Sequence, residues 1–153
     1  MSRGNVRFFE DVTIGEEFVS HTAYLVTGEE ITSYAGKWDP QPYHVDEEQA
    51  KRTMVGRLFA PSILTLAISV RLSHESGYCD ISSVAGLGID ELRMTKPVLV
   101  DDELKVKATV MSMRESKSRP KLGVMTTRIE VINQNGEIVL SYLLSGLVNR
   151  RPQ

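Results

Sequence analysis

The sequence predicts an α+β domain in which one curled antiparallel sheet wraps around a single long apolar helix. Three observations support this fold class. The run from Pro61 to Leu72 is mostly apolar, four strand-like segments joined by turns follow Gly77, and one strand-like segment precedes the helices. A sheet curled around an apolar helix buries the hydrophobic surface of both. With 153 residues, 41% of them hydrophobic, we expect a single domain over residues 1–153.

The chain starts with one predicted strand and a capped helix. Phe18, Tyr24 and Val26 lie an even number of positions apart, as side chains on one face of a strand do. Thr27 stands three positions before Glu30 and matches a capping box, in which both side chains accept hydrogen bonds from backbone N–H groups. We therefore expect a short helix that ends at the proline-rich segment.

The proline-rich segment carries the candidate chemistry. Pro40 and Pro42 each remove a backbone donor and push the preceding residue into extended geometry, so we expect a stiff and irregular loop. Asp39 and His44 lie on this loop, which would hold a carboxylate and an imidazole at the fixed separation that an acid/base pair needs. Residues 46–52 begin with acids and end with bases, which predicts a brief second helix.

The apolar run that follows predicts the central helix. Pro61 suits a first helical position, because the N–H that proline lacks would have no partner there. The run to Leu72 leaves almost no polar face, and such a helix is usually surrounded by other structure. It is too short to span a bilayer. We expect a helix buried on all sides.

The second half of the chain predicts the sheet. Four strands are expected, over residues 83–98, 104–110, 124–132 and 138–148. Gly86 and Gly88 predict a bulge or a close backbone approach in the first of these, and Asn135-Gly136 predicts a tight hairpin turn before the last. A single sheet leaves edges and an outer face, so we predict dimerisation through strands or through the helix layer.

Composition argues against several classes of partner. The formal net charge of −2 gives no electrostatic footprint for nucleic acid or an anionic membrane. The single cysteine, Cys79, fits a reducing compartment, and neither a signal peptide nor a membrane-spanning run is evident. We expect a cytoplasmic protein that binds no nucleic acid and no membrane. His21 and His74 lack the spacing of a metal site with His44, so we predict no metal.

The spacing of Asp39 and His44 also permits a purely structural interpretation. Asp39 can cap or turn the loop, and His44 can be a satisfied polar group beside the second helix. The place of His44 just before that helix favours instead a ring that faces a cavity. Ser62 lies outside any Gly-x-Ser-x-Gly motif, so we do not predict a serine nucleophile.

The segment Asp39 to Ala50 resembles the hydratase signature of the MaoC-like dehydratase family, which includes the (R)-specific enoyl-CoA hydratases. The family signature has an Asp and a His five residues apart around an Asn-Pro, and a small residue six positions later, here Ala50. The resemblance extends to residues 9–15, 86–93 and 133–137. It implies the hot-dog fold, a curled antiparallel sheet around one long helix, which agrees with the layout above.

The resemblance implies roles for individual residues. Asp39 and His44 would hold and activate a water molecule that adds to a trans-2-enoyl-CoA thioester. A glycine N–H at the start of the family's central helix contributes to the oxyanion hole, and Ser62 takes that place here. Gln41 replaces the Asn of the signature and is one methylene longer. Both replacements bear on substrate choice.

The resemblance also implies what the protein binds. We assign substrate contacts to Gln41, Tyr43 and Arg57. The basic loop 117–121 is typical of solvated surface, and the alternative is that this loop or Arg57 contacts the coenzyme A phosphates. No cofactor is expected, because coenzyme A is part of the substrate. Family members work at least as dimers, which implies a homodimer or a dimer-based higher oligomer with acyl-CoA sites near the interface.

Two other functions stay open at this stage. The first is a hot-dog acyl-CoA thioesterase, in which a carboxylate activates water against the thioester carbonyl instead of the double bond. The second is a non-catalytic subunit that binds acyl-CoA or an acyl carrier. The fold does not choose among them, because function depends on the site.

Overall fold

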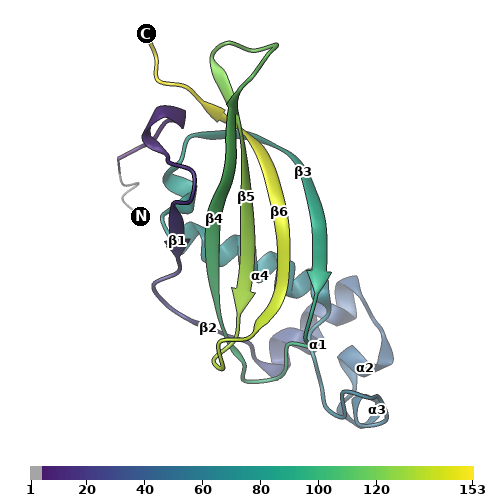
Figure 1. Ribbon diagram of the computed structural model, residues 1–153. Coiled ribbons are helices and arrows are strands. Elements are labelled where there is room, and N and C mark those ends of the chain that lie inside the picture. The colour runs from purple at the N-terminus through teal and green to yellow at the C-terminus, as the bar shows by residue number, and fades with distance from the viewer. Residues whose placement is uncertain (1–4) are drawn as a thin grey trace.

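A computed structural model describes residues 5–153, and in it one antiparallel sheet curls around a long helix (Figure 1). The expected domain 1–153 therefore includes four residues that lie outside the described chain. The strand order is β1-β4-β5-β6-β3, with β2 also paired to β4. The strands are β1 Glu17–Val19, β2 Tyr24–Leu25, β3 Ser83–Met94, β4 Glu103–Glu115, β5 Leu122–Ile132 and β6 Ile138–Asn149.

The helices lie between β2 and β3 in the chain. They are α1 Gly28–Trp38, α2 Pro42–Val45, α3 Glu47–Ala50 and α4 Ser62–Glu75, with short 3-10 turns at Phe9–Asp11 and Tyr78–Asp80. α4 crosses one face of the sheet, whereas α1, α2 and α3 gather beyond one end of β3 (Figure 1). This arrangement brings α2 near the start of α4, and these two elements form the candidate site.

The four expected strands are confirmed, with changes at the ends. Register shifts between Gly86 and Gly88 confirm the predicted bulge in β3, but this strand ends at Met94 and not at Val98. The expected first strand is two short strands. Phe18 pairs with Ala108 and Tyr24 pairs with Leu104. The two paired residues are six positions apart in the first segment but only four apart on β4, so the chain between β1 and β2 must bulge away from the sheet.

The capping prediction for α1 is confirmed in part. The Thr27 hydroxyl accepts a hydrogen bond from the N–H of Glu30 at 3.2 Å, as expected. The Glu30 carboxylate does not complete the box, because it accepts a hydrogen bond from the Tyr24 hydroxyl at 2.5 Å instead. The helix start is therefore tied to β2 as well as to its own cap.

The prediction of an irregular loop around Pro42 is wrong. Residues Pro42–Val45 form one helical turn, α2, with Pro42 at its start, where a missing N–H costs nothing. Pro61, expected inside the central helix, is its N-cap in extended geometry. The second helix is shorter than expected, and the Asp46 carboxylate caps it by accepting hydrogen bonds from Glu48 and Gln49.

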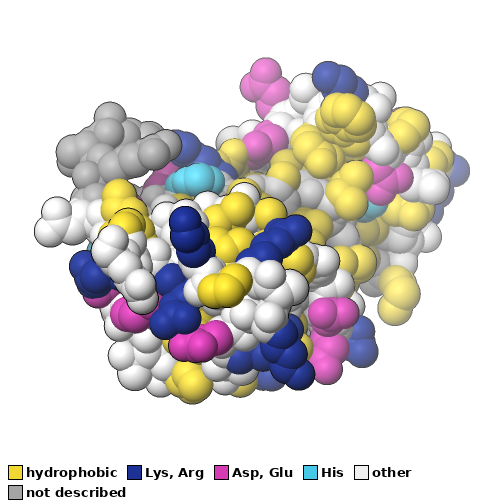
Figure 2. All heavy atoms as spheres, turned by 90° about the horizontal axis from the view of Figure 1, so that it is seen from above, with side chains coloured by type: hydrophobic (Ala, Val, Ile, Leu, Met, Phe, Trp, Pro, Cys, Tyr) yellow, Lys and Arg dark blue, Asp and Glu magenta, His cyan; other side chains and the backbone are white. Residues whose placement is uncertain are grey.

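The central helix α4 is buried on one side only. Leu64, Ile68 and Leu72 pack into the core, whereas Ile63 and Val70 are 45% and 52% exposed. The expectation of burial on all sides is therefore wrong for the single chain. On the edge strand β3 further apolar side chains are exposed, among them Val84, Leu87, Ile89 and Met94. Hydrophobic side chains accordingly gather on one side of the molecule (Figure 2).

Candidate active site

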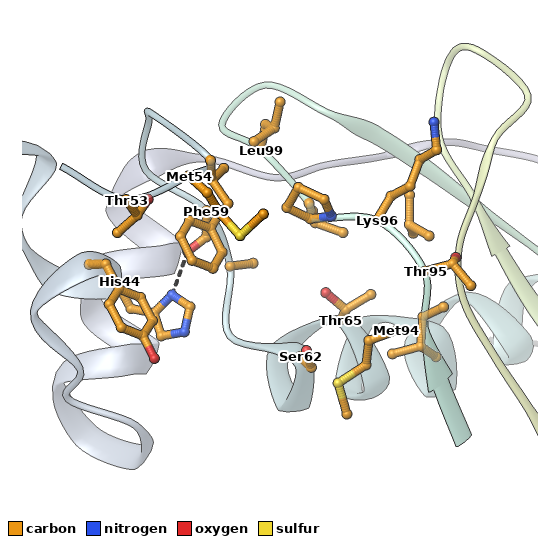
Figure 3. Close-up of a pocket in the computed structure, with 17 residues that line it drawn as sticks. His44, Thr53, Met54, Phe59, Ser62, Thr65, Met94, Thr95, Lys96 and Leu99 are labelled. Carbon is orange, nitrogen blue, oxygen red and sulfur yellow. Dashed lines mark hydrogen bonds between the residues drawn. The ribbon is translucent and has the colours of Figure 1, made fainter. Parts of the chain in front are cut away.

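A cavity of about 960 Å³ lies between α2, the start of α4 and the segment after β3 (Figure 3). Its walls are mostly apolar, with a few polar groups from α2 and α4. The residues that line it include Tyr43, His44, Phe59, Ser62, Thr65 and Lys96. A mostly apolar cavity with a small number of placed polar groups is typical of a small-molecule site.

The imidazole of His44 is buried and held in one orientation. Its Nδ1 lies 2.7 Å from the carbonyl oxygen of Phe59, and its side chain is nearly inaccessible. The rings of Tyr43 and Phe59 stack with centroids 5.4 Å apart, and each meets the His44 ring edge-on. A carbonyl can only accept, so Nδ1 carries the hydrogen, and Nε2 of the neutral ring is the acceptor.

Asp39 meets this free nitrogen. It follows α1 as its C-cap, and its backbone N–H donates to the Ala35 carbonyl at 2.9 Å. One carboxylate oxygen lies 3.7 Å from Nε2 of His44, a separation that leaves space for a shared water or substrate proton. The fold thus brings the predicted pair together, with the imidazole at the cavity wall and the carboxylate beside it.

The start of α4 supplies hydrogen-bond donors to the same cavity. Ser62 is the first residue of the helix and lines the cavity. No carbonyl in the described chain accepts a hydrogen bond from its backbone N–H, as expected for the first turn of a helix. The positive end of the helix dipole also lies here. The geometry therefore suits the predicted place of Ser62 beside developing negative charge.

The predicted substrate contacts do not all reach the cavity. Tyr43 lines it, whereas Gln41 is exposed at the start of α2 and is not part of the wall. Arg57 lines a smaller neighbouring cavity of about 430 Å³, to which Lys96 also contributes. The basic loop 117–121 joins β4 to β5 at the opposite end of the sheet from α2 (Figure 1). Arg57 is therefore the better placed of the two predicted phosphate contacts.

Sequence reasoning missed two groups of this site. The Phe59 carbonyl that orients His44 is a backbone atom, and no residue pattern points to it. Thr65 lies in the cavity wall, only 3% exposed. The sequence does not distinguish it from the other hydroxyl residues of the same helix, Ser62, Ser69 and Ser73.

Charge and metal-ligand chemistry at the cavity are limited. Lys96 is the one Lys, Arg, Asp or Glu side chain among its lining residues, and it forms an ion pair with Glu137 at 2.9 Å. Within residues 5–153, no group of three or more His, Cys, Asp or Glu side chains is arranged to hold a metal ion. In the same range, no helix is long and apolar enough to cross a membrane.

Comparisons with known proteins agree with this architecture. A protein-family model described as a MaoC-like domain matches residues 8–135. Mesaconyl-CoA hydratase of Cereibacter sphaeroides is 30% identical over 95% of this chain, which spans 42% of that relative. The crystal structure of a MaoC-like dehydratase from Rhodospirillum rubrum is 37% identical, with a TM-score of 0.89 over 96% of this chain and 99% of that one. A conserved hypothetical protein from Mycobacterium tuberculosis with a double hotdog fold, 17% identical with a TM-score of 0.76 over 97% of this chain and 46% of that one, supports the fold alone.

Proposed function

The chain belongs to the MaoC-like domain family, and we propose that it adds water reversibly to a trans-2-enoyl-CoA thioester. Related proteins are named hydratases or dehydratases, so the chain is assigned to enzymes that add or remove water. The choice of an enoyl-CoA substrate is supported by relatives named mesaconyl-CoA hydratase, and the proposed chemistry of water addition rests on the site. The observation that carries it is the His44 ring, whose Nδ1 is bound to Phe59 while Nε2 stays free beside Asp39.

This geometry supports His44 as the base in the proposed reaction. A water molecule that contacts both Nε2 and the Asp39 carboxylate from one side gives a proton to Nε2 as its oxygen bonds to C3 of the enoyl group. The electron pair of the double bond moves toward the thioester oxygen and forms an enolate. His44 then returns the proton to C2, so that hydrogen and hydroxyl are added across the double bond. Asp39 orients the water and stabilises the transient imidazolium by its negative charge.

The enolate oxygen needs hydrogen-bond donors. The N–H of Ser62 and the positive end of α4 are the proposed stabilisers, because both are at the cavity wall next to His44. The side chain of Ser62 narrows the space that a glycine would leave there. This replacement is expected to disfavour bulky groups near the thioester.

The remaining contacts follow from the placement of the residues. We assign Tyr43 to the acyl group and Arg57 to a coenzyme A phosphate, since Arg57 is exposed at the neighbouring cavity. Gln41 reaches substrate only outside the main cavity. The reaction moves protons and needs no redox cofactor or metal, and coenzyme A enters as part of the substrate. We propose the cytoplasm as its location and a homodimer as its working form.

The test follows the absorbance of the conjugated thioester of crotonyl-CoA with the purified protein. We expect the wild type to remove this absorbance without releasing free thiol. Asp39→Asn and His44→Ala should lower kcat by about 10²- to 10⁴-fold, the usual contribution of a general acid or base. His21→Ala, which removes an exposed imidazole elsewhere, should keep wild-type activity.

Other outcomes would support the other functions. Release of free coenzyme A by the wild type would indicate a thioesterase. Binding of crotonyl-CoA without turnover would indicate a binding subunit. Wild-type kcat in a folded His44→Ala variant would contradict the role of His44, with folding checked by circular dichroism and the thermal midpoint.

A further inference from the structure

Thr65 presents a buried hydroxyl without a protein partner. The residue is 3% exposed, and no described atom forms a hydrogen bond with its side chain. The next hydroxyls along the same helix behave differently: Ser69 donates to the Leu66 carbonyl at 2.6 Å and Ser73 to the Ser69 carbonyl at 2.8 Å. A helical hydroxyl normally satisfies itself in this way when it is buried. The Thr65 hydroxyl, in contrast, donates to no carbonyl of the helix.

The free hydroxyl opens onto the cavity. No fully enclosed side-chain oxygen or nitrogen in the described chain lacks a partner, so the small exposed area of Thr65 must include its hydroxyl. Thr65 is part of the cavity wall, and its side chain points into the cavity next to Ser62 (Figure 3). A ligand that fills the cavity therefore meets this hydroxyl.

Thr65 and Ser62 lie on the same face of α4. Residues three positions apart are neighbours on a helix surface. Because the Cα–Cβ bonds of a helix tilt toward its N-terminus, the Thr65 side chain leans toward the free amides of the first turn. A side-chain hydroxyl and a backbone N–H are thus presented together at the positive end of a helix of 14 residues.

We propose that the Thr65 hydroxyl is the second donor to the thioester oxygen of the substrate. This inference rests on the proposed hydration of an enoyl thioester. As water bonds to C3 and negative charge moves onto that oxygen, the hydroxyl and the Ser62 N–H donate to it together, and the hydroxyl keeps its proton. Two convergent donors stabilise this charge more than one donor does.

A purely structural role does not account for the residue. Valine has nearly the shape of threonine, favours a helix about as well, and would bury no hydroxyl at this place. The packing of a buried side chain at this position of α4 does not require an oxygen atom. The hydroxyl is therefore expected to act on the ligand.

The first experiment compares Thr65→Val with Thr65→Ser in the hydration of crotonyl-CoA. We expect Thr65→Val to lower kcat about 10²-fold with a nearly unchanged KM, and Thr65→Ser to keep most of the activity. Thr126→Val is the matched control, because its hydroxyl is bonded to Ser145 on the sheet and lies outside the cavity wall. If Thr65→Val does not fold, Thr65→Ala replaces it. A folded variant without the hydroxyl and with wild-type kcat overturns the proposal but leaves the proposed function intact.

The second experiment does not depend on turnover. Butyryl-CoA, labelled with ¹³C at the thioester carbonyl, is bound to each variant and the carbonyl stretching frequency is recorded by infrared difference spectroscopy. We expect a lower frequency in the wild type than in free butyryl-CoA, a return toward the free value in Thr65→Val, and recovery in Thr65→Ser. Equal frequencies in the wild type and Thr65→Val overturn the proposal even if crotonyl-CoA is not hydrated.

Discussion

At the scale of single residues, the site depends on what surrounds the His44 ring. The imidazole is held by the Phe59 carbonyl and by two aromatic rings, so only Nε2 is available to chemistry. Asp39 alone would not select this nitrogen, because a carboxylate can approach either side of an imidazole. The backbone carbonyl therefore decides which nitrogen stays free for the proposed role as base.

Close packing at Gly123 leads to a prediction for stability. A Cβ added there would lie 2.2 Å from the Phe9 ring, so Gly123→Ala should lower the free energy of unfolding by about 1–3 kcal/mol through overpacking. The matched control is Gly36→Ala on α1, where nothing lies within 4 Å of the added carbon. That change should stabilise the protein by about 0.5–1 kcal/mol. Urea unfolding of both variants checks the two signs.

A second variant identifies the cause at Gly123. If the Phe9 ring is responsible, Phe9→Leu should reduce the cost of Gly123→Ala in a double-mutant cycle. If Gly123→Ala lowers the free energy of unfolding equally in the wild type and in Phe9→Leu, the strain does not arise from the Phe9 ring.

At the scale of elements, ion pairs tie the N-terminal segment to the sheet. Arg7 pairs through a β-bridge with Ile81, and its guanidinium binds both oxygens of Glu16 at 2.6 and 3.0 Å. The N–H of Thr13 donates to the same carboxylate. The hydrogen bond from Arg7, followed by that from Thr13, lowers the pKa of Glu16 below its ordinary value of 4.5. The 3-10 turn before β1 is thereby held against the sheet.

This ion pair predicts a pH dependence of stability. A lowered pKa means that the folded state prefers the ionised carboxyl, so the stabilisation is present above about pH 4.5 and is lost as the pH falls through the folded-state pKa. Glu16→Gln should cost about 1 kcal/mol at pH 7, after discount for solvent screening, and less at pH 3. Chemical unfolding at both pH values measures the difference.

The control for this prediction is an exposed pair. Glu48 binds Lys51 on α3 and both side chains are mostly exposed. Glu48→Gln should leave the unfolding curve unchanged at either pH. A Glu16→Gln effect of the same size at pH 3 and pH 7 would mean that shape and not charge accounts for it.

At the scale of the whole molecule, an apolar surface is left uncovered. β3 is an edge strand of the sheet with exposed apolar side chains, and α4 exposes Ile63 and Val70. Natural sheets rarely leave such an edge free, since unpaired strands associate. We predict dimerisation through strands or through the helix layer, and the candidate surfaces for these two modes are β3 and the exposed side of α4.

The dimer is tested by placing a charge on this surface. We expect the wild type to have the mass of a dimer in size-exclusion chromatography with light scattering, and Leu87→Lys on β3 to shift it toward the monomer. Ile14→Lys, at an equally exposed apolar residue before β1, should leave the mass unchanged. A monomeric wild type would refute the predicted dimer.

The sequence by itself determined the features that depend on local patterns. The Thr27 cap, the bulge at Gly86 and Gly88, the four main strands and the long apolar helix all follow from side-chain periodicity, capping and turn chemistry. Asp39 and His44 could be proposed as a pair for the same reason, because a short segment carries both. α2 was missed, since prolines that exclude a helix interior also suit a helix start.

Only the tertiary structure decided which atoms meet across the chain. The first strand breaks because β4 has fewer positions than the segment opposite it, and α4 is buried on one face because a single sheet covers only one face. The Phe59 carbonyl comes to His44 from fifteen residues away, and Thr65 keeps a free hydroxyl because a cavity opens beside it. Such contacts depend on the packing of segments that are distant in the chain, and local sequence propensity does not predict them.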